Sequence, residues 1–294
     1  MLELTYQNHF KYGFNQIPFS IRQSLTDNWF VSYGHITRPT LNFKEECIQT
    51  AKLIRDTKQG PLWILLSGGI DSEIVLRSFI EAHIPVRAAI IRFKSDLNIH
   101  DMSYAVIAAE TLGVPYKIID VDIIYFLNNT VYDIAKISYS SNLSMNVVSW
   151  CVSQIDGIPI IGTGDIYLEL MPTGNYAMTK AEHIVGVDYY LTNTNRDGVP
   201  GFFQYTPEIM HSWLHDDLTK QFVNDSRFWG STKLKFDIYR YYFNDAVDRT
   251  KYTGYEKLRW SYIQTNNKLK TMYGSAVAYI DHDKLCTMLG NKDE

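Results

Sequence analysis

The sequence predicts an α/β fold with three layers, in which helices cover a parallel sheet, together with a small N-terminal extension and a mostly helical C-terminal region. Short apolar runs alternate with helical patterns between residues 59 and 170, as in parallel sheets. Two of these runs end in glycine-rich turns, Ser67-Gly68-Gly69 and Gly162-Thr163-Gly164. Such sheets bind ligands at the carboxyl ends of their strands, so both turns are candidate ligand sites.

Each element of the alternation has its own signal in the sequence. Apolar runs indicate strands, and Pro85-Val86 opens the second of them. Parallel strands of this kind are joined by right-handed crossovers. The expected strands are 61–66, 85–93, 116–121 and 158–161, and the expected helices are 71–82, 101–112, 122–137 and 144–155.

The two flanks lack this alternation. Phe19 to Tyr33 alternates enough to predict one or two strands, and Phe43 to Arg55 has helical periodicity. Val185 to Tyr205 resembles a hairpin around Asp197-Gly198, whereas Thr206-Pro207-Glu208 is a helix start. We therefore expect three regions: an extension over 1–58, a domain that carries both candidate ligand sites over 59–170 and a mostly helical region over 171–294.

Composition excludes several classes of protein. The chain has 294 residues, of which 46% are hydrophobic and 20% charged, as in folded globular proteins. It has no apolar run of about 18 residues and no signal-like start, so a soluble, cytoplasmic protein without a membrane partner is expected. Cys47, Cys151 and Cys286 are widely spaced, which favours reduced thiols over a zinc knuckle or disulfide framework.

The charge distribution is uneven. The net charge of −4 predicts no general attraction to nucleic acid. Residues 227–270, however, contain ten Lys and Arg against four Asp and Glu, interleaved with aromatic residues. Three interpretations stay open for this segment: a helical module with a solvated basic face, a clamp for a small anionic substrate, or a surface that binds nucleic acid.

The most informative segment is the loop that follows the first predicted strand, Ser67-Gly68-Gly69-Ile70-Asp71-Ser72. Two glycines let the backbone approach a ligand closely. The free N–H groups of the loop and of the following helical turn, with the positive end of the helix dipole, face an anion. Ser67 and Ser72 add hydroxyl donors, so the loop predicts a phosphate site.

This loop resembles the PP-loop of the N-type ATP pyrophosphatases, whose signature is Ser-Gly-Gly-Xaa-Asp-Ser after the first strand. It lacks the Gly-Lys-Ser/Thr ending of a Walker loop. The resemblance implies a Rossmann-like fold of the adenine nucleotide alpha hydrolase type, with a PP-loop ATP-binding domain over 59–170 and a substrate-specificity region over 171–294. It also implies that the loop residues, including Ile70, hold the β- and γ-phosphates of ATP, and that Asp71 is catalytic and reaches Mg²⁺. The alternative for Asp71 is a carboxylate that only complements the helix dipole.

The resemblance extends to two later positions. Arg92 and Phe93, at the end of the second strand, would recognise adenine, although Phe93 could equally be a core residue. The turn Gly162-Thr163-Gly164-Asp165 would lie near the α-phosphate, with Asp165 as a second catalytic and metal-binding acid. A surface turn is the alternative. Asp165 and Glu169 would share one face if a helix began there.

Three further polar residues near the loop have a local interpretation. Glu73, in the first turn of the predicted helix, is expected to be solvated, because near the phosphates it would need a metal or a cationic partner. His100 is expected to be a surface residue, and Asp101 a charge that complements the start of the next helix.

The resemblance implies an ATP-dependent, AMP-forming enzyme of the ligase kind, which adenylylates a substrate oxygen, releases pyrophosphate and transfers nitrogen. Asparagine-synthetase-like and NAD-synthetase-like amide formers are the nearest candidates. Since Met1 is followed by Leu2, no N-terminal cysteine is available for a glutaminase, so a separate glutaminase, ammonia or an amine would supply the nitrogen. A sulfur-transfer or phosphoadenylylsulfate-reductase-like enzyme, and a nucleotide-binding module without catalysis, stay open, as does homo-oligomerisation.

Overall fold

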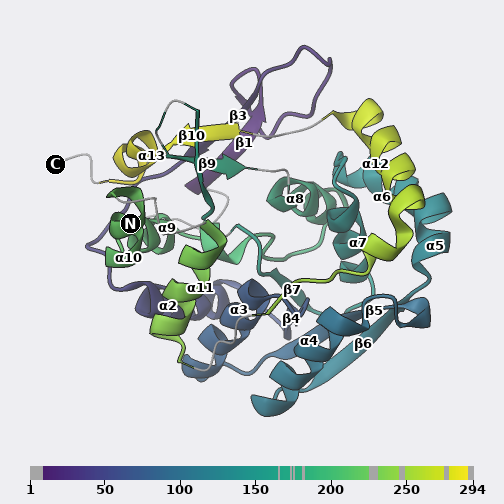
Figure 1. Ribbon diagram of the computed structural model, residues 1–294, viewed down its shortest axis with the longest axis horizontal. Helices are drawn as coiled ribbons and strands as arrows, with labels where there is room; N and C mark the ends of the chain where they lie inside the picture. The colour runs from purple at the N-terminus through teal and green to yellow at the C-terminus, as the bar shows by residue number, and fades with distance from the viewer. Residues whose placement is uncertain are drawn as a thin grey trace.

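The fold is built on a four-stranded parallel sheet, seen in a computed structural model that describes residues 9–164, 166–172, 174, 176–180, 183–224, 231–244, 249–274 and 278–290 (Figure 1). The strand order is β6-β5-β4-β7. Helices flank the sheet, so the predicted α/β class is confirmed. The strands are β4 (Leu62–Leu65), β5 (Arg87–Phe93), β6 (Tyr116–Val121) and β7 (Ile158–Ile161).

The helices between these strands follow the predicted alternation. One expected helix, 122–137, is interrupted, because a π-helical turn (Phe126–Thr130) separates a short first turn from the rest. The others agree with prediction to within a few residues. The helices are α3 (Ile70–Glu81), α4 (Ile99–Thr111), α5 (Ile123–Tyr125), α6 (Val131–Ser138) and α7 (Leu143–Val152).

Strand β4 separates two hydrophobic cores, because successive side chains of a strand point to opposite faces of the sheet. Leu62 and Ile64 belong to the core that contains α3 and α4. Trp63 and Leu65 belong to the core that contains α6 and α7. With both faces covered, β4 is buried along its whole length, which explains its continuous apolar sequence.

The N-terminal extension forms an antiparallel sheet and a helix. Strands β1 (Phe10–Phe14), β2 (Ile17–Pro18) and β3 (Trp29–Tyr33) pair in the order β2-β1-β3. Only β3 and the predicted helix, now α2 (Phe43–Thr57), had a clear signal in the sequence. Asn42 and Glu45 form a capping box at the start of α2.

The predicted hairpin over Val185 to Tyr205 is wrong, because the first part of it is helix α8 (His183–Asn193). The apolar residues of α8 contribute to both cores, Ile184 to one and Val187 to the other. The turn after α8 lies at Thr194-Asn195 and not at Asp197-Gly198, and the chain then reaches Val199, which forms a parallel bridge with Ile160 at the edge of the sheet.

The rest of the C-terminal region is helical as expected, except for an antiparallel sheet that the sequence did not predict. Thr206 caps α9 (Pro207–Leu214) through its side chain, which accepts from the Ile209 N–H. The other helices are α10 (Asp217–Asn224), α11 (Ser231–Tyr242), α12 (Arg259–Tyr273) and α13 (His282–Leu289). The sheet has the order β10-β9-β8, with β8 (Leu168–Leu170), β9 (Tyr176–Lys180) and β10 (Ala278–Asp281).

This second antiparallel sheet lies beside the N-terminal one, with β10 in contact with β3 (Figure 1). Residues far apart in sequence, such as Phe10, Ile64, Trp213 and Leu285, share one hydrophobic core. The three expected regions therefore pack around a common centre. In the described part of the chain, no helix is both long and apolar enough to cross a membrane.

Candidate nucleotide site

The predicted phosphate loop lies at the carboxyl end of β4 and leads directly into α3. The hydroxyls of Ser67 and Ser72 form hydrogen bonds within the loop. Ser72 Oγ donates to the Gly69 carbonyl at 2.9 Å and accepts from the Ser67 N–H at 3.1 Å, while Ser67 Oγ accepts from the Gly69 N–H at 3.2 Å. The loop is thus held in one conformation by its own side chains.

Two glycines let neighbouring backbone segments approach this loop. Gly68 has a φ of +81°, and a Cβ built on it would lie 1.8 Å from the carbonyl oxygen of Asp101. A Cβ on Gly162 would lie 2.9 Å from Cα of Ser72. The first turn of α4 and the turn after β7 therefore pack directly against the loop, so the two glycine-rich turns of the sequence meet in space.

The start of α3 is available to an anion. Gly69 is its N-cap and has no side chain, so no side-chain hydrogen bond caps the helix. The N–H groups of the first helical turn have no partners within a helix, and they carry the positive end of the dipole. This arrangement fits a phosphate group.

Asp71 is held by two residues of α11. Lys235 Nζ lies 3.0 Å from Asp71 Oδ2, and the Tyr239 hydroxyl donates to Asp71 Oδ1 at 2.9 Å. The Asp71 side chain is 23% exposed, and that of Lys235 is 15% exposed. The C-terminal region therefore places a cation and a hydroxyl beside the loop.

Glu73 is buried, and the expectation that it is solvated is wrong. Arg77 Nε donates to Glu73 Oε1 at 2.8 Å, and Arg249 forms an ion pair with Glu73 Oε2. The Arg249 guanidinium also lies over the Tyr104 ring, 4.9 Å from its centroid, and its Nε is buried without a hydrogen-bond partner. The positive charges of Arg77 and Arg249 thus compensate the negative charge of the Glu73 carboxylate, which was expected to face solvent.

Asp101 is buried as well, although it does lie in the first turn of α4. Its Oδ1 accepts from the Tyr252 N–H at 2.7 Å and lies 3.2 Å from His100 Nδ1. His100 is largely exposed, as expected. Segment 249–254 therefore lies beside the loop region and contacts it twice, through the ion pair of Arg249 with Glu73 and through the hydrogen bond from the Tyr252 N–H to Asp101.

Arg92 and Phe93 lie at the carboxyl end of β5 with different surroundings. Arg92 pairs with Asp120 on the neighbouring strand, with Nε to Oδ1 at 2.5 Å. Phe93 is 4% exposed and packs against Tyr255, with the ring centroids 5.2 Å apart. Of the two interpretations left open for Phe93, the structure places its side chain in the core, and its backbone N–H donates to Asn98 Oδ1.

The second glycine-rich turn is held from the side of α9. Thr163 Oγ1 donates to the Pro200 carbonyl at 2.6 Å, and Gln204 Nε2 donates to the Gly164 carbonyl at 3.0 Å. Asp165 lies outside the described residues. Glu169 lies in strand β8, so the condition under which it would share a helical face with Asp165 is not met.

No group of three or more potential metal-binding side chains gathers among the residues that the structure describes. Mg²⁺ bound with a nucleotide would not need such a group, because one or two carboxylates, the phosphates and several waters would hold it. Asp71, at the start of α3, is the described carboxylate that would serve. The donor set thus fits a magnesium nucleotide better than a metal ion alone.

The cysteines are poor nucleophiles in this fold. Cys47 and Cys151 are fully buried, and burial raises the pKa of both thiols well above the ordinary value. Cys286 is partly buried, and burial raises its thiol pKa to about 11. A thiolate is the reactive form, so none of the three is activated.

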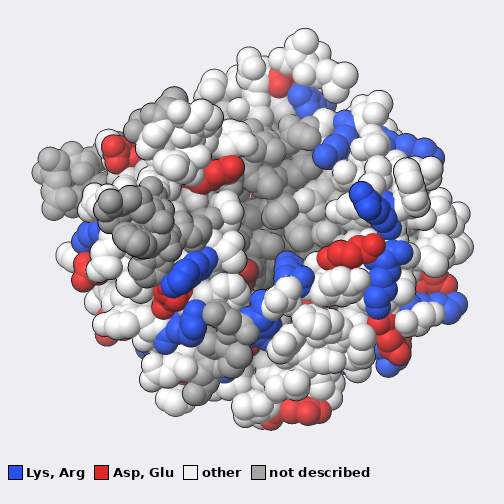
Figure 2. Space-filling model, in the orientation of Figure 1, with Lys and Arg blue, Asp and Glu red and all other residues white. Residues whose placement is uncertain are grey.

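Lys235, Tyr239 and Arg249 were not singled out from the sequence. The signal that could have found them is the basic, aromatic segment 227–270, whose excess of positive charge contrasts with the acidic remainder of the chain. In the described part of this segment Tyr239 and Phe243 are buried, whereas Tyr241 and Trp260 are exposed. Figure 2 shows Lys and Arg side chains, with acids among them, on the side where α12 lies.

Comparison with known proteins gives weak similarities. No family model matches the sequence, and no curated protein sequence matches it. Among solved structures, NMN synthetase from Francisella tularensis has 17% identity and a TM-score of 0.38, covering 78% of this chain and 85% of that one. NH3-dependent NAD synthetase from Campylobacter jejuni has 16% identity and a TM-score of 0.37, covering 77% and 94%.

A third structure is glutamine-dependent NAD+ synthetase from Acinetobacter baumannii, with 14% identity and a TM-score of 0.34, covering 94% of this chain and 57% of that one. All three TM-scores lie below 0.5, so these similarities do not establish a family or a function for the chain. The parallel sheet and its helices establish the α/β fold. The likeness to the PP-loop rests on the sequence Ser67 to Ser72 and on its place between β4 and α3.

Proposed function

We propose that the protein is an ATP-dependent, AMP-forming enzyme that adenylylates an oxygen of a small acceptor, releases pyrophosphate and passes the activated group to a nitrogen nucleophile. The observation that carries the proposal is the Ser67–Ser72 loop, which joins the central parallel strand to an uncapped helix start. The rest of the proposal depends on this phosphate site.

The loop would bind the β- and γ-phosphates through backbone N–H groups. Those of the first turn of α3 point out of the helix start, and the serine hydroxyls keep the loop in shape. Bound ATP and Mg²⁺ would supply the leaving group and the charge that stabilises it. Donors that are already in position need no reorganisation when negative charge develops on pyrophosphate.

Asp71 and Lys235 have complementary roles in this proposal. The ion pair keeps the Asp71 carboxylate neutralised while no phosphate is present. Asp71 would hold Mg²⁺, with Asp165 as a second acid, and the lysine ammonium would then be available to phosphate oxygens. Arg92 and the backbone beside Phe93 would face the adenine, and Gly162, Thr163 and Gly164 would lie near the α-phosphate.

The products of ATP cleavage test the proposal. The protein is incubated with α-³²P-labelled ATP, MgCl₂, ammonium chloride and a mixture of small carboxylic acids, and the labelled products are separated. Labelled AMP is expected, with an equal amount of pyrophosphate, which carries no label and is measured separately. ADP as the sole labelled product contradicts the proposal.

Two variants show whether Asp71 acts in this reaction. Asp71→Asn should lower AMP formation at least tenfold, because it removes a charge from the metal site. The matched control is Asp133→Asn, since Asp133 is a surface acid whose side chain is 77% exposed and pairs only with Lys136 in the described contacts. Equal loss in both variants would show that Asp71 has no special role.

The sulfur-transfer alternative has less support. It requires a reactive thiol, but the three cysteines are buried or partly buried with raised pKa values. Nitrogen transfer needs no thiol on this chain, because ammonia, an amine or a separate glutaminase supplies the nucleophile.

A further inference from the structure

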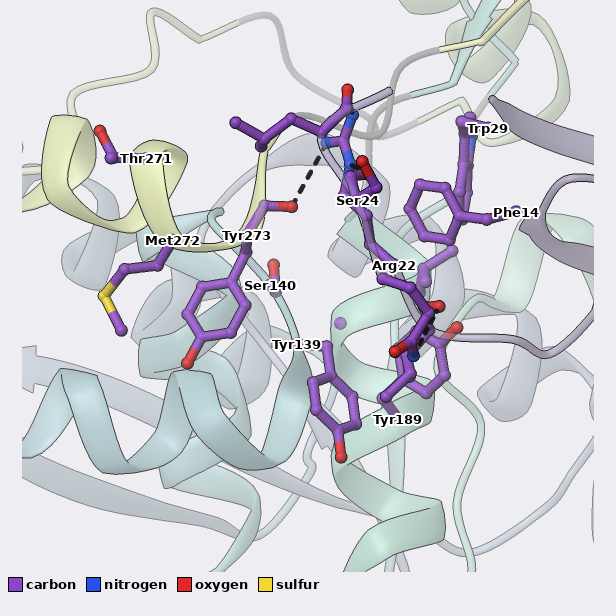
Figure 3. Close-up of a pocket in the computed structure, with 15 residues that line it drawn as sticks. Phe14, Arg22, Ser24, Trp29, Tyr139, Ser140, Tyr189, Thr271, Met272 and Tyr273 are labelled. Carbon is purple, nitrogen blue, oxygen red and sulfur yellow. Dashed lines mark hydrogen bonds between the residues drawn. The ribbon is translucent and has the colours of Figure 1, made fainter. Parts of the chain in front are cut away.

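A cavity of about 180 Å³ lies away from the phosphate loop, between the N-terminal sheet and the helices of the second core (Figure 3). Three distant parts of the chain form its walls: the segment from Phe14 to Trp29, the facing ends of α6 and α8, and the end of α12. An engineered apolar cavity of about 150 Å³ holds one benzene molecule, so this space suits a single ring with a small substituent.

Aromatic rings make up much of the wall, and they are fixed. The Tyr189 hydroxyl donates to the Ser20 carbonyl at 2.6 Å, and its ring meets that of Tyr139 edge-on at 5.5 Å. Phe14 and Trp29 meet in the same way at 5.0 Å. Rings that are locked in place bind a planar ligand with little loss of conformational freedom.

Arg22 is the one charged side chain among the described residues that line the cavity. Its Nε and Nη2 donate to the carbonyls of Ser24 and Leu25, each at 3.0 Å, and Nη1 donates to the Tyr273 carbonyl at 3.5 Å. These bonds are to neutral acceptors, so they orient the guanidinium without cancelling its charge.

Neighbouring residues are adapted to this position of Arg22. The guanidinium carbon lies 5.4 Å from the centroid of the Phe14 ring, and a Cβ on Gly274 would lie only 1.6 Å from Arg22 Nη1. The nearby acid Asp27 accepts hydrogen bonds from Asn15 and from the Gln23 and Ser24 N–H groups, and it does not line the cavity. These hydrogen bonds lower the pKa of Asp27, and the charge of Arg22 adds to the effect, but the two side chains form no ion pair in the described contacts.

We propose that this cavity is a binding site for a small aromatic anion, such as a single-ring carboxylate, with the ring between the aromatic side chains and the charge toward Arg22. The site is independent of the proposed ATP chemistry, because none of its walls belongs to the phosphate loop. It also gives the N-terminal extension a role, since that segment supplies Arg22, Phe14 and Trp29.

Ligand-observed saturation-transfer NMR without ATP tests this site. The probes are sodium benzoate, benzamide and benzylamine, which share one ring and differ in charge. Benzoate should bind with a Kd of about 1 mM, as expected for a ligand of this size. Benzamide should bind about tenfold more weakly, and benzylamine should show no transfer, because only benzoate gains a charge-assisted contact. No saturation transfer to benzoate at about ten times that Kd overturns the proposal.

Variants locate the binding. Leu25 lines the cavity and is 68% exposed, so Leu25→Trp should fill the space without disturbing the core and abolish benzoate binding. Leu170→Trp, at a 52% exposed position on β8, is the matched control and should bind normally. Equal binding by both variants would show that benzoate lies elsewhere.

Arg22→Gln should make benzoate and benzamide bind equally, and Arg22→Lys should keep a preference for benzoate. A thermal melt of each variant checks that it is folded. An unchanged preference in folded Arg22→Gln contradicts the assigned role of the guanidinium.

Discussion

Replacing Gly68 by alanine should damage the protein more than replacing other loop glycines. Two separate costs arise at this position. A φ of +81° is unfavourable for a residue with a Cβ, by about 1–2 kcal/mol. The Cβ would also lie 1.8 Å from the Asp101 carbonyl oxygen, which is backbone at the start of α4 and has to move by more than 1 Å. Overpacking of this kind costs about 1–3 kcal/mol.

The expected loss of unfolding free energy for Gly68→Ala is therefore about 2–5 kcal/mol. Urea denaturation followed by circular dichroism measures it. Two controls separate the causes. Gly60→Ala has a positive φ of +114° with nothing within 4 Å of the new Cβ, so it should lose only about 1–2 kcal/mol. Gly69→Ala has an ordinary φ of −75° and its nearest contact is a side-chain oxygen at 3.3 Å, so it should change stability by less than about 1 kcal/mol.

If Gly68→Ala were as stable as Gly69→Ala, the close contact between the loop and α4 would be refuted. If it matched Gly60→Ala, the strain argument would hold and the packing argument would fail. ATP affinity gives a second test, because α4 has to shift away from the loop. Gly68→Ala should therefore bind ATP more weakly even at temperatures where it is folded.

Three other predictions concern buried acids and buried thiols. Glu73→Ala should lower the unfolding free energy by about 3–5 kcal/mol, because it removes a buried carboxylate that pairs with two largely buried arginines. Glu81→Ala, at a partly exposed pair with Lys44, should cost less than about 1 kcal/mol, and similar urea midpoints for the two variants would contradict this difference. Burial raises the pKa of Asp188 from 3.8 to about 6, so the stability it contributes is complete below pH 3.8 and is lost as the pH rises through 6. Asp188→Asn should thus gain stability relative to the wild type between pH 4 and 6, and a constant difference across that range would refute the shift. Ellman's reagent should react slowly with Cys286 in the folded protein. It should react with Cys47 and Cys151 only after unfolding, so rapid labelling of all three native thiols would contradict their burial.

Much of the central sheet could be predicted from the sequence, because β4 and β7 are fully buried and β5 is mostly buried, so they read as apolar runs, whereas the edge strand β6 is partly exposed and contains polar residues. The loop at Ser67–Ser72 could be placed for the same reason, since β4 ends where the apolar run ends. Helix α8 could not be predicted, because it contributes to two cores and so has apolar residues on opposite sides. Its sequence lacks the single apolar stripe that identifies a surface helix.

The partners of the loop acids could not be found from the sequence. Lys235 and Arg249 lie more than 160 residues from Asp71 and Glu73, and no local pattern connects an acid to a base at that separation. The cavity beside Arg22 could not be predicted for the same reason, because its walls come from parts of the chain that are far apart in sequence. Distant contacts depend on how the elements pack, which a reading of local periodicity does not address.

These long separations have a consequence for the order in which the protein folds. The β4-α3 unit is local and is complete once about the first 90 residues have been synthesised. The distant partners of Asp71, Glu73 and Asp101 lie in residues 235–252, at separations of 164, 176 and 151 residues. Contacts between residues so far apart in sequence form late, because closing long loops costs chain entropy. During synthesis the acids around the loop therefore lack these distant contacts until about residue 250 has left the ribosome, and the loop is held from the side of α11 only when the last quarter of the fold has docked.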